Sequence, residues 1–191
     1  MEKQIDPRIL RTRKLIMDAF IELTKKTDFN DITIGDITSA ATVNRATFYN
    51  HFMDKYDLLE KVLSESVMRE VLQEVSMHEV INEETIKSIF ISIIKFHTSV
   101  GNQCQRSYEA FTPQIETIFK KELQAFFSEC AQRQWSNQNR LEIETFAVML
   151  SWSLYGAAMY WMQNRTTKPE DYVKQILHII KLEYTDEGNA N

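Results

Sequence analysis

Hydrogen-bonding side chains gather in one short stretch of the N-terminal region. They are Arg45, Thr47, Tyr49, His51 and Lys55. Phe48 and Phe52 lie among them, four residues apart, so on a helix they share the buried side and turn polar groups outward. Arginine can bond guanine or phosphate, and the Ala46 methyl can touch a thymine methyl. This pattern has the chemistry of a helix that reads the major groove of DNA.

The elements around this stretch are expected to be short helices. Thr33, with Asp36 three residues later, predicts a capped helix start, and Asn44 is a strong cap for the next helix. Asp54 caps a longer fourth helix. The ranges predicted from periodicity are about 7–26, 34–41, 45–51 and 55–76. Short helices separated by a tight turn, then a longer helix, indicate a helix-turn-helix domain.

The segment from Thr33 to Leu59 closely resembles the N-terminal domain of TetR-family (tetracycline-repressor-like) regulators. The most specific part reads Thr47-Phe48-Tyr49-x-His51-Phe52-x-x-Lys55, and the resemblance covers about residues 8–60. It implies a dimer that binds double-stranded DNA at a pseudo-palindromic operator. The DNA-binding residues expected on this basis and from residue type are Thr33, Asn44, Arg45, Ala46, Thr47, Tyr49, Asn50, His51 and Lys55.

Each of these residues also has a purely structural interpretation. His51 can be a partly buried core histidine, and Tyr49 can cover the edge of the core. Arg45 and Lys55 can be solvated charges. One position departs from the family pattern, which often has Gly in the turn where this chain has Thr42. A β-branched residue disfavours positive φ, so either the turn avoids that conformation or it tolerates strain.

The rest of the chain predicts a second helical unit, and no alternating strand pattern is present. The fold class is all-α, divided as 1–56 (helix-turn-helix), 57–185 and 186–191 (polar tail). The resemblance to TetR-family regulators implies that 57–185 serves effector binding and dimerisation. The helices expected in the second unit are about 83–99, 103–111, 113–135, 141–164 and 169–184.

Aromatic residues are concentrated in this second unit. Aromatic side chains at helical spacing usually form core, but some can line a pocket for a flat or apolar effector. The candidates are Phe90, Phe96, Phe111, Phe119, Trp135 and Trp152.

The stretch 146–162 carries no charged residue. It is diluted by Ser, Tyr and Gly, so a buried helix is expected rather than a membrane span. Small residues there permit close approach of a second copy in a four-helix interface. The interface residues expected are Ser153, Gly156, Ala157, Tyr160, Ile176 and Ile180.

Composition narrows the class of protein further. The net charge is −5, yet residues 1–56 carry a net +1, which leaves room for a local basic footprint. Cys104 and Cys130 fit neither a disulfide framework nor a zinc pattern. The first ten residues are too charged for a signal peptide, so a cytoplasmic protein is expected. No metal and no cofactor is expected.

Catalytic patterns are missing from the sequence. The four histidines form no HExxH-type pair, and neither a phosphate-binding Gly-rich loop nor a nucleophile elbow is present. The leading hypothesis, which the resemblance to TetR-family regulators implies, is a ligand-responsive repressor whose dimer leaves its operator when a small molecule binds. The alternative is a co-regulator of the same fold that acts through a partner protein, and a helical enzyme is a third, weaker option.

Overall fold

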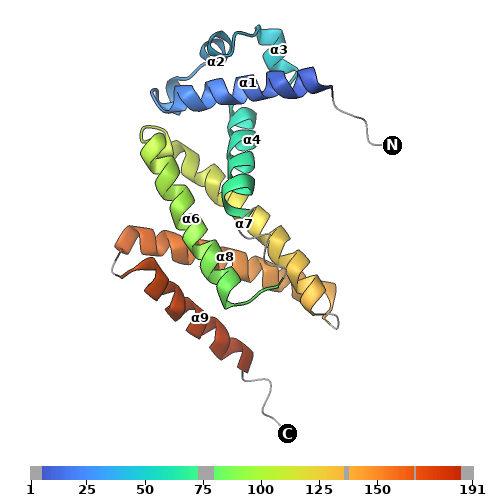
Figure 1. Cartoon of the computed structure of the whole chain (residues 1–191), viewed down its shortest axis with the longest axis vertical. Helices are drawn as coiled ribbons and strands as arrows, with labels where there is room; N and C mark the ends of the chain where they lie inside the picture. The colour runs from blue at the N-terminus through green and yellow to red at the C-terminus, as the bar shows by residue number, and fades with distance from the viewer. Residues whose placement is uncertain (1–5, 73–79, 136–137, 166, 186–191) are drawn as a thin grey trace. The chain divides into compact units, whose positions relative to one another are not determined.

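The structure is a computed structural model that describes residues 6–72, 80–135, 138–165 and 167–185. Every regular element within those ranges is helical (Figure 1). The N-terminal helices are α1 (Pro7–Thr24), the short η1 (Phe29–Asp31), α2 (Ile34–Ala40), α3 (Arg45–Tyr49) and α4 (Lys55–Val67). A π-helical turn, η2 (Met68–Leu72), extends α4. The later helices are α6 (Glu83–Gln103), α7 (Tyr108–Gln134), α8 (Arg140–Asn164) and α9 (Pro169–Thr185).

The chain forms two compact units. The first contains the residues up to Ser66 together with Ser99–Ile115, and the second contains Val67–Thr98 and the chain from Glu116 on. This division differs from the boundary after residue 56 proposed from sequence, because α4 continues unbroken through that point. It also assigns the turn between α6 and α7 to the N-terminal unit. The proposed tail, 186–191, lies outside the described residues.

The N-terminal helices begin where side chains satisfy their first N–H groups. Asp6 accepts from Arg8 N–H ahead of Pro7, and Asn44 accepts from Thr47 N–H at 2.8 Å. Thr33 and Asp36 form a reciprocal capping box on α2. The predicted caps at Thr33 and Asn44 are confirmed, and Asp6 is a cap that the sequence analysis did not name. Each cap leaves fewer N–H groups unpaired at its helix start.

The core of the first unit is aromatic. Phe20, Phe29, Phe48 and Phe52 are each at most 2% exposed, and Phe29 meets the ring of Phe20 edge to face at 6.1 Å. α1 packs against α2, which with α3 lies along one side of it (Figure 1). Burial of this size favours one fixed arrangement of the short helices, which are too short to be stable alone.

Two helix boundaries predicted for the part of the chain after residue 100 were wrong. A helix over 103–111 and a break at Pro113 were expected, but α6 ends at Gln103 and α7 runs from Tyr108 through Pro113. Proline removes one backbone donor and crowds the preceding turn. Because Pro113 lies in the second turn of α7, it disturbs little helix before it, and the helix continues.

The sequence suggested that the uncharged part of α8 is buried on most sides, but the structure shows that it is not. Leu150, Leu154 and Ala158 are buried, but Met149 and Tyr160 on the other side are each 59% exposed. The low charge of this helix therefore reflects one buried face and one exposed apolar face. Among the described residues, no helix combines the length and the apolar character needed to cross a bilayer.

Candidate nucleic-acid interface

The helix-turn-helix segment is held by a tight turn between α2 and α3. Val43 N–H donates to Thr38 O at 3.0 Å, and Thr42 N–H donates to Ser39 O at 3.2 Å. Thr42 has φ = 55°, so the turn takes the left-handed conformation and tolerates strain at a β-branched residue. Of the two outcomes left open by the sequence, the structure has the strained one.

α3 has one buried side and one exposed side. Phe48 is fully buried and packs on Phe52, with ring centroids 5.7 Å apart. Arg45, Ala46 and Asn50 are exposed, and Tyr49 is 56% exposed with its ring edge-to-face on Phe48. Thr47 is half-buried at the border. The spacing of the two phenylalanines predicted that the polar residues of α3 face outward, and in the structure they do.

The side chain of Arg45 lies beside the N-terminal turn of α2. A Cβ added to Gly35 would come within 3.3 Å of Arg45 Nη2 and 3.4 Å of Thr33 Oγ1. Gly35 was not identified from the sequence, although a glycine inside a capped helix, where it is normally unfavourable, was the available signal. Because Gly35 has no side chain, the guanidinium of Arg45 has room beside it.

Thr33 is exposed at the start of α2, but its hydroxyl is already engaged. Its Oγ1 donates to Asp36 Oδ2 at 2.6 Å and accepts from Asp36 N–H at 3.2 Å. The hydrogen bond from Thr33 lowers the pKa of the Asp36 carboxyl. Contact of this hydroxyl with a phosphate requires exchange of the bond to Asp36. Asn44 is similar, since its side-chain oxygen caps α3.

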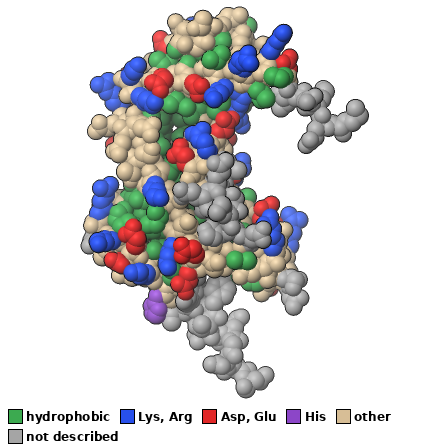
Figure 2. Space-filling view, viewed as in Figure 1, with side chains coloured by type: hydrophobic (Ala, Val, Ile, Leu, Met, Phe, Trp, Pro, Cys, Tyr) green, Lys and Arg blue, Asp and Glu red, His purple; other side chains and the backbone are tan. Residues whose placement is uncertain are grey.

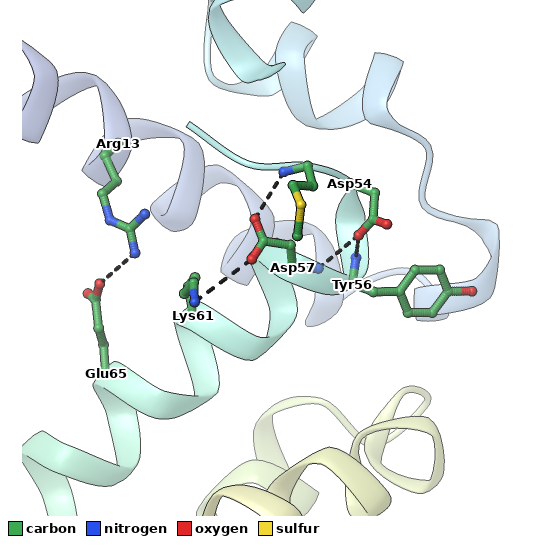
Figure 3. A network of polar contacts seen from close by, with 7 residues as sticks. Arg13, Asp54, Tyr56, Asp57, Lys61 and Glu65 are labelled. Carbon is green, nitrogen blue, oxygen red and sulfur yellow. Dashed lines mark hydrogen bonds and ion pairs between the residues drawn. The ribbon is translucent and has the colours of Figure 1, made fainter. Parts of the chain in front are cut away.

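His51 is half-buried just after α3. Desolvation, and then the nearby charge of Arg13, lower its pKa below the usual 6.5. His51 is therefore a neutral hydrogen-bonding group at neutral pH rather than a cation. Arg13, on α1, is held by Glu65 Oε1 at 3.1 Å (Figure 3). Its guanidinium also lies over the ring of Phe52, 4.9 Å from the ring centroid.

Lys55 has surroundings that the sequence did not predict. Its ammonium donates to the backbone carbonyls of Phe29, Asn30 and Ile32 at 2.9 to 3.0 Å. An ammonium has three protons, and these three bonds use them. Lys55 thus differs from the exposed α3 residues in having its donors committed inside the protein.

The start of α4, which follows α3, is fixed by two aspartates (Figure 3). Asp54 Oδ1 accepts from Tyr56 N–H and Asp57 N–H, each at 2.8 Å. Asp57 in turn accepts from Met53 N–H at 2.9 Å and lies 3.9 Å from Lys61 Nζ. The exit from α3 therefore has a defined path into α4.

Both signs of charge occur on each unit on the face shown in Figure 2. This face is therefore not uniformly basic. No group of three or more potential metal-ligating side chains is found in the part of the chain that the structure describes.

The six proposed effector residues are not brought to one place. Phe111 belongs to the first unit, where its ring meets Phe29 at 5.5 Å. In the second unit, Phe96 and Phe119 meet at 5.3 Å. The others have separate neighbours: Phe90 lies against Tyr172, Trp135 against Phe146, and Trp152 is 54% exposed beneath Lys120 Nζ.

A buried polar pair lies beside Phe96 and Phe119. His97 is 1% exposed and stacks on Phe119, and its Nε2 is 3.2 Å from the Tyr155 hydroxyl. Desolvation lowers the pKa of His97 to about 4. A separate open cavity of about 270 Å³ is lined by Trp135, Gln138, Glu142, Ile143 and Phe146. That volume is slightly below the range of about 300–1,000 Å³ typical of ligand pockets.

Three of the six proposed dimer residues, Ser153, Gly156 and Tyr160, lie on an exposed strip of α8. Ser153 and Gly156 are exposed, and a Cβ added to Gly156 would meet no atom within 4 Å. Met149, Trp152 and Tyr160 continue the strip. Met149 was not singled out from the sequence, and Trp152 was expected in the effector pocket. Ala157 and Ile176 are half-buried. The side chain of Ile180 lies outside the described part of α9. We call Met149, Trp152, Ser153, Gly156 and Tyr160 the α8 strip.

A capped second helix, a tight turn and a short helix with a buried aromatic side and an exposed polar side define a helix-turn-helix DNA-binding protein. Residues 16–62 match the family model described as bacterial regulatory proteins, tetR family. An uncharacterized HTH-type transcriptional regulator, YxbF of Bacillus subtilis (strain 168), is 46% identical over 66 residues, 34% of this chain. The dhaKLM operon activator DhaS of Lactococcus lactis subsp. lactis (strain IL1403) is 38% identical over 48 residues, 25% of this chain.

Solved structures extend the likeness to most of the fold. The dihydroxyacetone kinase operon activator DhaS has a TM-score of 0.57 at 16% identity, covering 91% of this chain and 96% of its own. A TetR transcriptional regulator from Streptococcus agalactiae has a TM-score of 0.56 at 22% identity, covering 92% and 96%. At these identities the likeness shows a common fold.

Residues 16–62 are therefore a DNA-binding helix-turn-helix domain of the bacterial tetR-family type, and the chain as a whole shares the fold of a solved TetR regulator. The family and these relatives are regulators and not enzymes, as expected from the sequence. The matched segments span 17% of YxbF and 26% of the DhaS sequence.

Proposed function

We propose that this regulator reads DNA with the exposed face of α3. The observation that supports this most directly is the burial of Phe48 beneath an exposed surface of Arg45, Ala46, Tyr49 and Asn50. Such a helix can enter the major groove, because its inner side is fixed to the core and its outer side is polar.

The proposed contacts differ in kind. Arg45, at the start of α3 and beside Gly35, bonds a guanine or a phosphate, and Ala46 touches a thymine methyl. Tyr49 and Asn50 contact sugar, phosphate or base edges. Thr33, Thr47 and His51 bond phosphate and set the register. Asn44 contributes chiefly by capping α3.

We propose that two copies associate through the α8 strip and α9, including Ala157, Ile176 and Ile180. An isologous contact of this kind relates two reading helices by a two-fold axis, as a pseudo-palindromic operator requires. The exposed apolar side chains of the strip, with open space at Gly156, support this proposal.

We propose further that the protein is a cytoplasmic repressor released from DNA by a small apolar or aromatic effector bound in the second unit. The aromatic cluster of Phe96 and Phe119 with the His97–Tyr155 pair supports that choice. Activation is the second candidate, since DhaS, similar over the helix-turn-helix region, is named an operon activator. A reporter fused to the bound promoter separates the two. Deletion of the regulator gene should raise reporter expression for a repressor and lower it for an activator.

The DNA proposal is tested by selecting bound duplexes from a random-sequence pool. The wild-type protein should enrich a palindromic duplex, and its affinity should fall steeply with added salt. Arg45→Ala should lose affinity for that duplex by roughly tenfold or more, the scale of one lost base contact. Arg140→Ala, an exposed arginine of α8, is the matched control and should bind as wild type.

Enrichment of no duplex, or binding that ignores salt, would overturn the DNA proposal. In that case the co-regulator alternative is tested by asking whether Arg45→Ala abolishes capture of a partner protein.

A further inference from the structure

We infer that Lys55 is a positioning residue that ties together the two ends of the helix-turn-helix segment, and that it makes no contact with DNA. The inference rests on the proposed function, because it concerns how the reading helix is held. It replaces the expectation from the sequence that Lys55 is a DNA-binding residue.

Lys55 is half-buried, and its ammonium is bonded to protein groups. It donates to Phe29 O at 2.9 Å, Asn30 O at 3.0 Å and Ile32 O at 2.9 Å. The face of the Phe29 ring lies 4.7 Å away and that of Tyr56 5.8 Å away, both within the range of cation–π attraction. A phosphate could be bound only by giving up one of these charge-assisted bonds.

These bonds join the residues just before α2 to the residue that begins α4, on either side of the helix-turn-helix segment. Ile32 directly precedes Thr33, the cap of α2, while Lys55 is the first residue of α4 and follows α3. Ile32 and Lys55 are 23 positions apart, and the segment between them therefore forms a loop closed by an ammonium–carbonyl bond. Both α2 and α3 lie inside that loop, so the clamp limits their orientation.

The site favours lysine in particular. Three carbonyls from one short turn converge on a single nitrogen, which suits a compact ammonium and not the planar fork of arginine. A cation at the first residue of a helix is unfavourable to the helix dipole. Asp54 and Asp57 in the same turn offset that charge and fix the backbone from which Lys55 extends.

The first experiment observes the ammonium directly by nitrogen–proton NMR of the free wild-type protein. A Lys55 signal, assigned by its loss in Lys55→Met, should persist near neutral pH because its protons are bonded internally. It should stay unchanged when duplex DNA or salt is added. Lys61, exposed on the same helix, should lose its signal to exchange. A Lys55 signal that appears only with DNA would overturn the inference.

The second experiment compares Lys55→Met, Lys55→Arg and the control Lys61→Met, each shown by circular dichroism to be folded. The probes are the duplex selected by the wild type and a shuffled duplex of equal length. Lys55→Met should lose about tenfold in preference for the selected duplex, comparable to one base contact. Its affinity for the shuffled duplex should match that of Lys61→Met, and Lys55→Arg should not restore the preference.

A phosphate contact gives the opposite pattern. Lys55→Met would then weaken both duplexes equally and lower the salt slope by about 1, and Lys55→Arg would recover both. That result would overturn the clamp. If Lys55→Met does not fold, the ammonium signal of the wild type still decides. Failure of the wild type to select any duplex would instead refute the proposed function.

Discussion

Thr42 is a strained residue in the turn between α2 and α3. Its φ of 55° is unfavourable for a β-branched residue, and its side chain is exposed. We expect Thr42→Gly to raise the free energy of unfolding by about 1 kcal/mol, because relief of the strain exceeds the greater flexibility that glycine gives the unfolded chain. Urea unfolding should show a higher midpoint at unchanged slope. Thr42→Ala, which keeps a Cβ, should gain less, and a less stable glycine variant would contradict this account.

His97 makes stability depend on pH. Its pKa is about 4 in the folded protein against 6.5 ordinarily, because burial disfavours the charged ring. Between these values the unfolded chain binds a proton that the native protein does not. The stability is therefore complete above pH 6.5 and falls by about 3 kcal/mol as the pH approaches 4.

The comparison of wild type with His97→Gln isolates this effect. His51 and Asp36, whose pKa values are also lowered, are present in both proteins and cancel in the difference. Urea unfolding at several pH values should show a shallower loss between pH 6.5 and 4 for the variant. Equal losses in the two proteins would mean that His97 does not carry the dependence.

At the scale of elements, the turn between α6 and α7 fastens the segment after α1. Ser107 is fully buried, and its hydroxyl accepts from Phe29 N–H at 2.9 Å and donates to Thr27 O at 3.4 Å. Ser107→Ala leaves the buried Phe29 N–H without that acceptor, which should cost about 1–3 kcal/mol of stability. Thermal unfolding measures the loss. Ser99→Ala, whose bond to Gln103 is exposed, should change little.

The features that the sequence predicted well are formed by residues within one helical turn of each other. The caps at Thr33 and Asn44 are three-residue patterns, so they are visible in the chain itself. Ser107 and Phe29 are 78 residues apart, and Lys55 and Ile32 are 23 apart, so nothing local indicates that they meet. The exposed face of α3 followed from two phenylalanines, whereas the role of Lys55 required the fold.

At the scale of the whole molecule, the same limit applies to the aromatic residues. Phe111 and Phe119 read alike in the sequence, yet one packs in the first unit and the other in the second. Helical spacing identifies which residues are buried, but it does not say against which partner. A six-residue effector pocket could therefore not be assembled from spacing alone.

The α8 strip allows the dimer to be tested without damage to the protomer. A side chain at Gly156 would extend into open space, so Gly156→Glu should leave the fold of one copy intact. In the proposed interface two such carboxylates would meet across the two-fold axis, lose water and repel one another. Sedimentation equilibrium should then find monomers, with unchanged helicity by circular dichroism. Ala125→Glu, the same change on an exposed face of α7, should remain dimeric, and a Gly156→Glu dimer as tight as wild type would place the contact elsewhere.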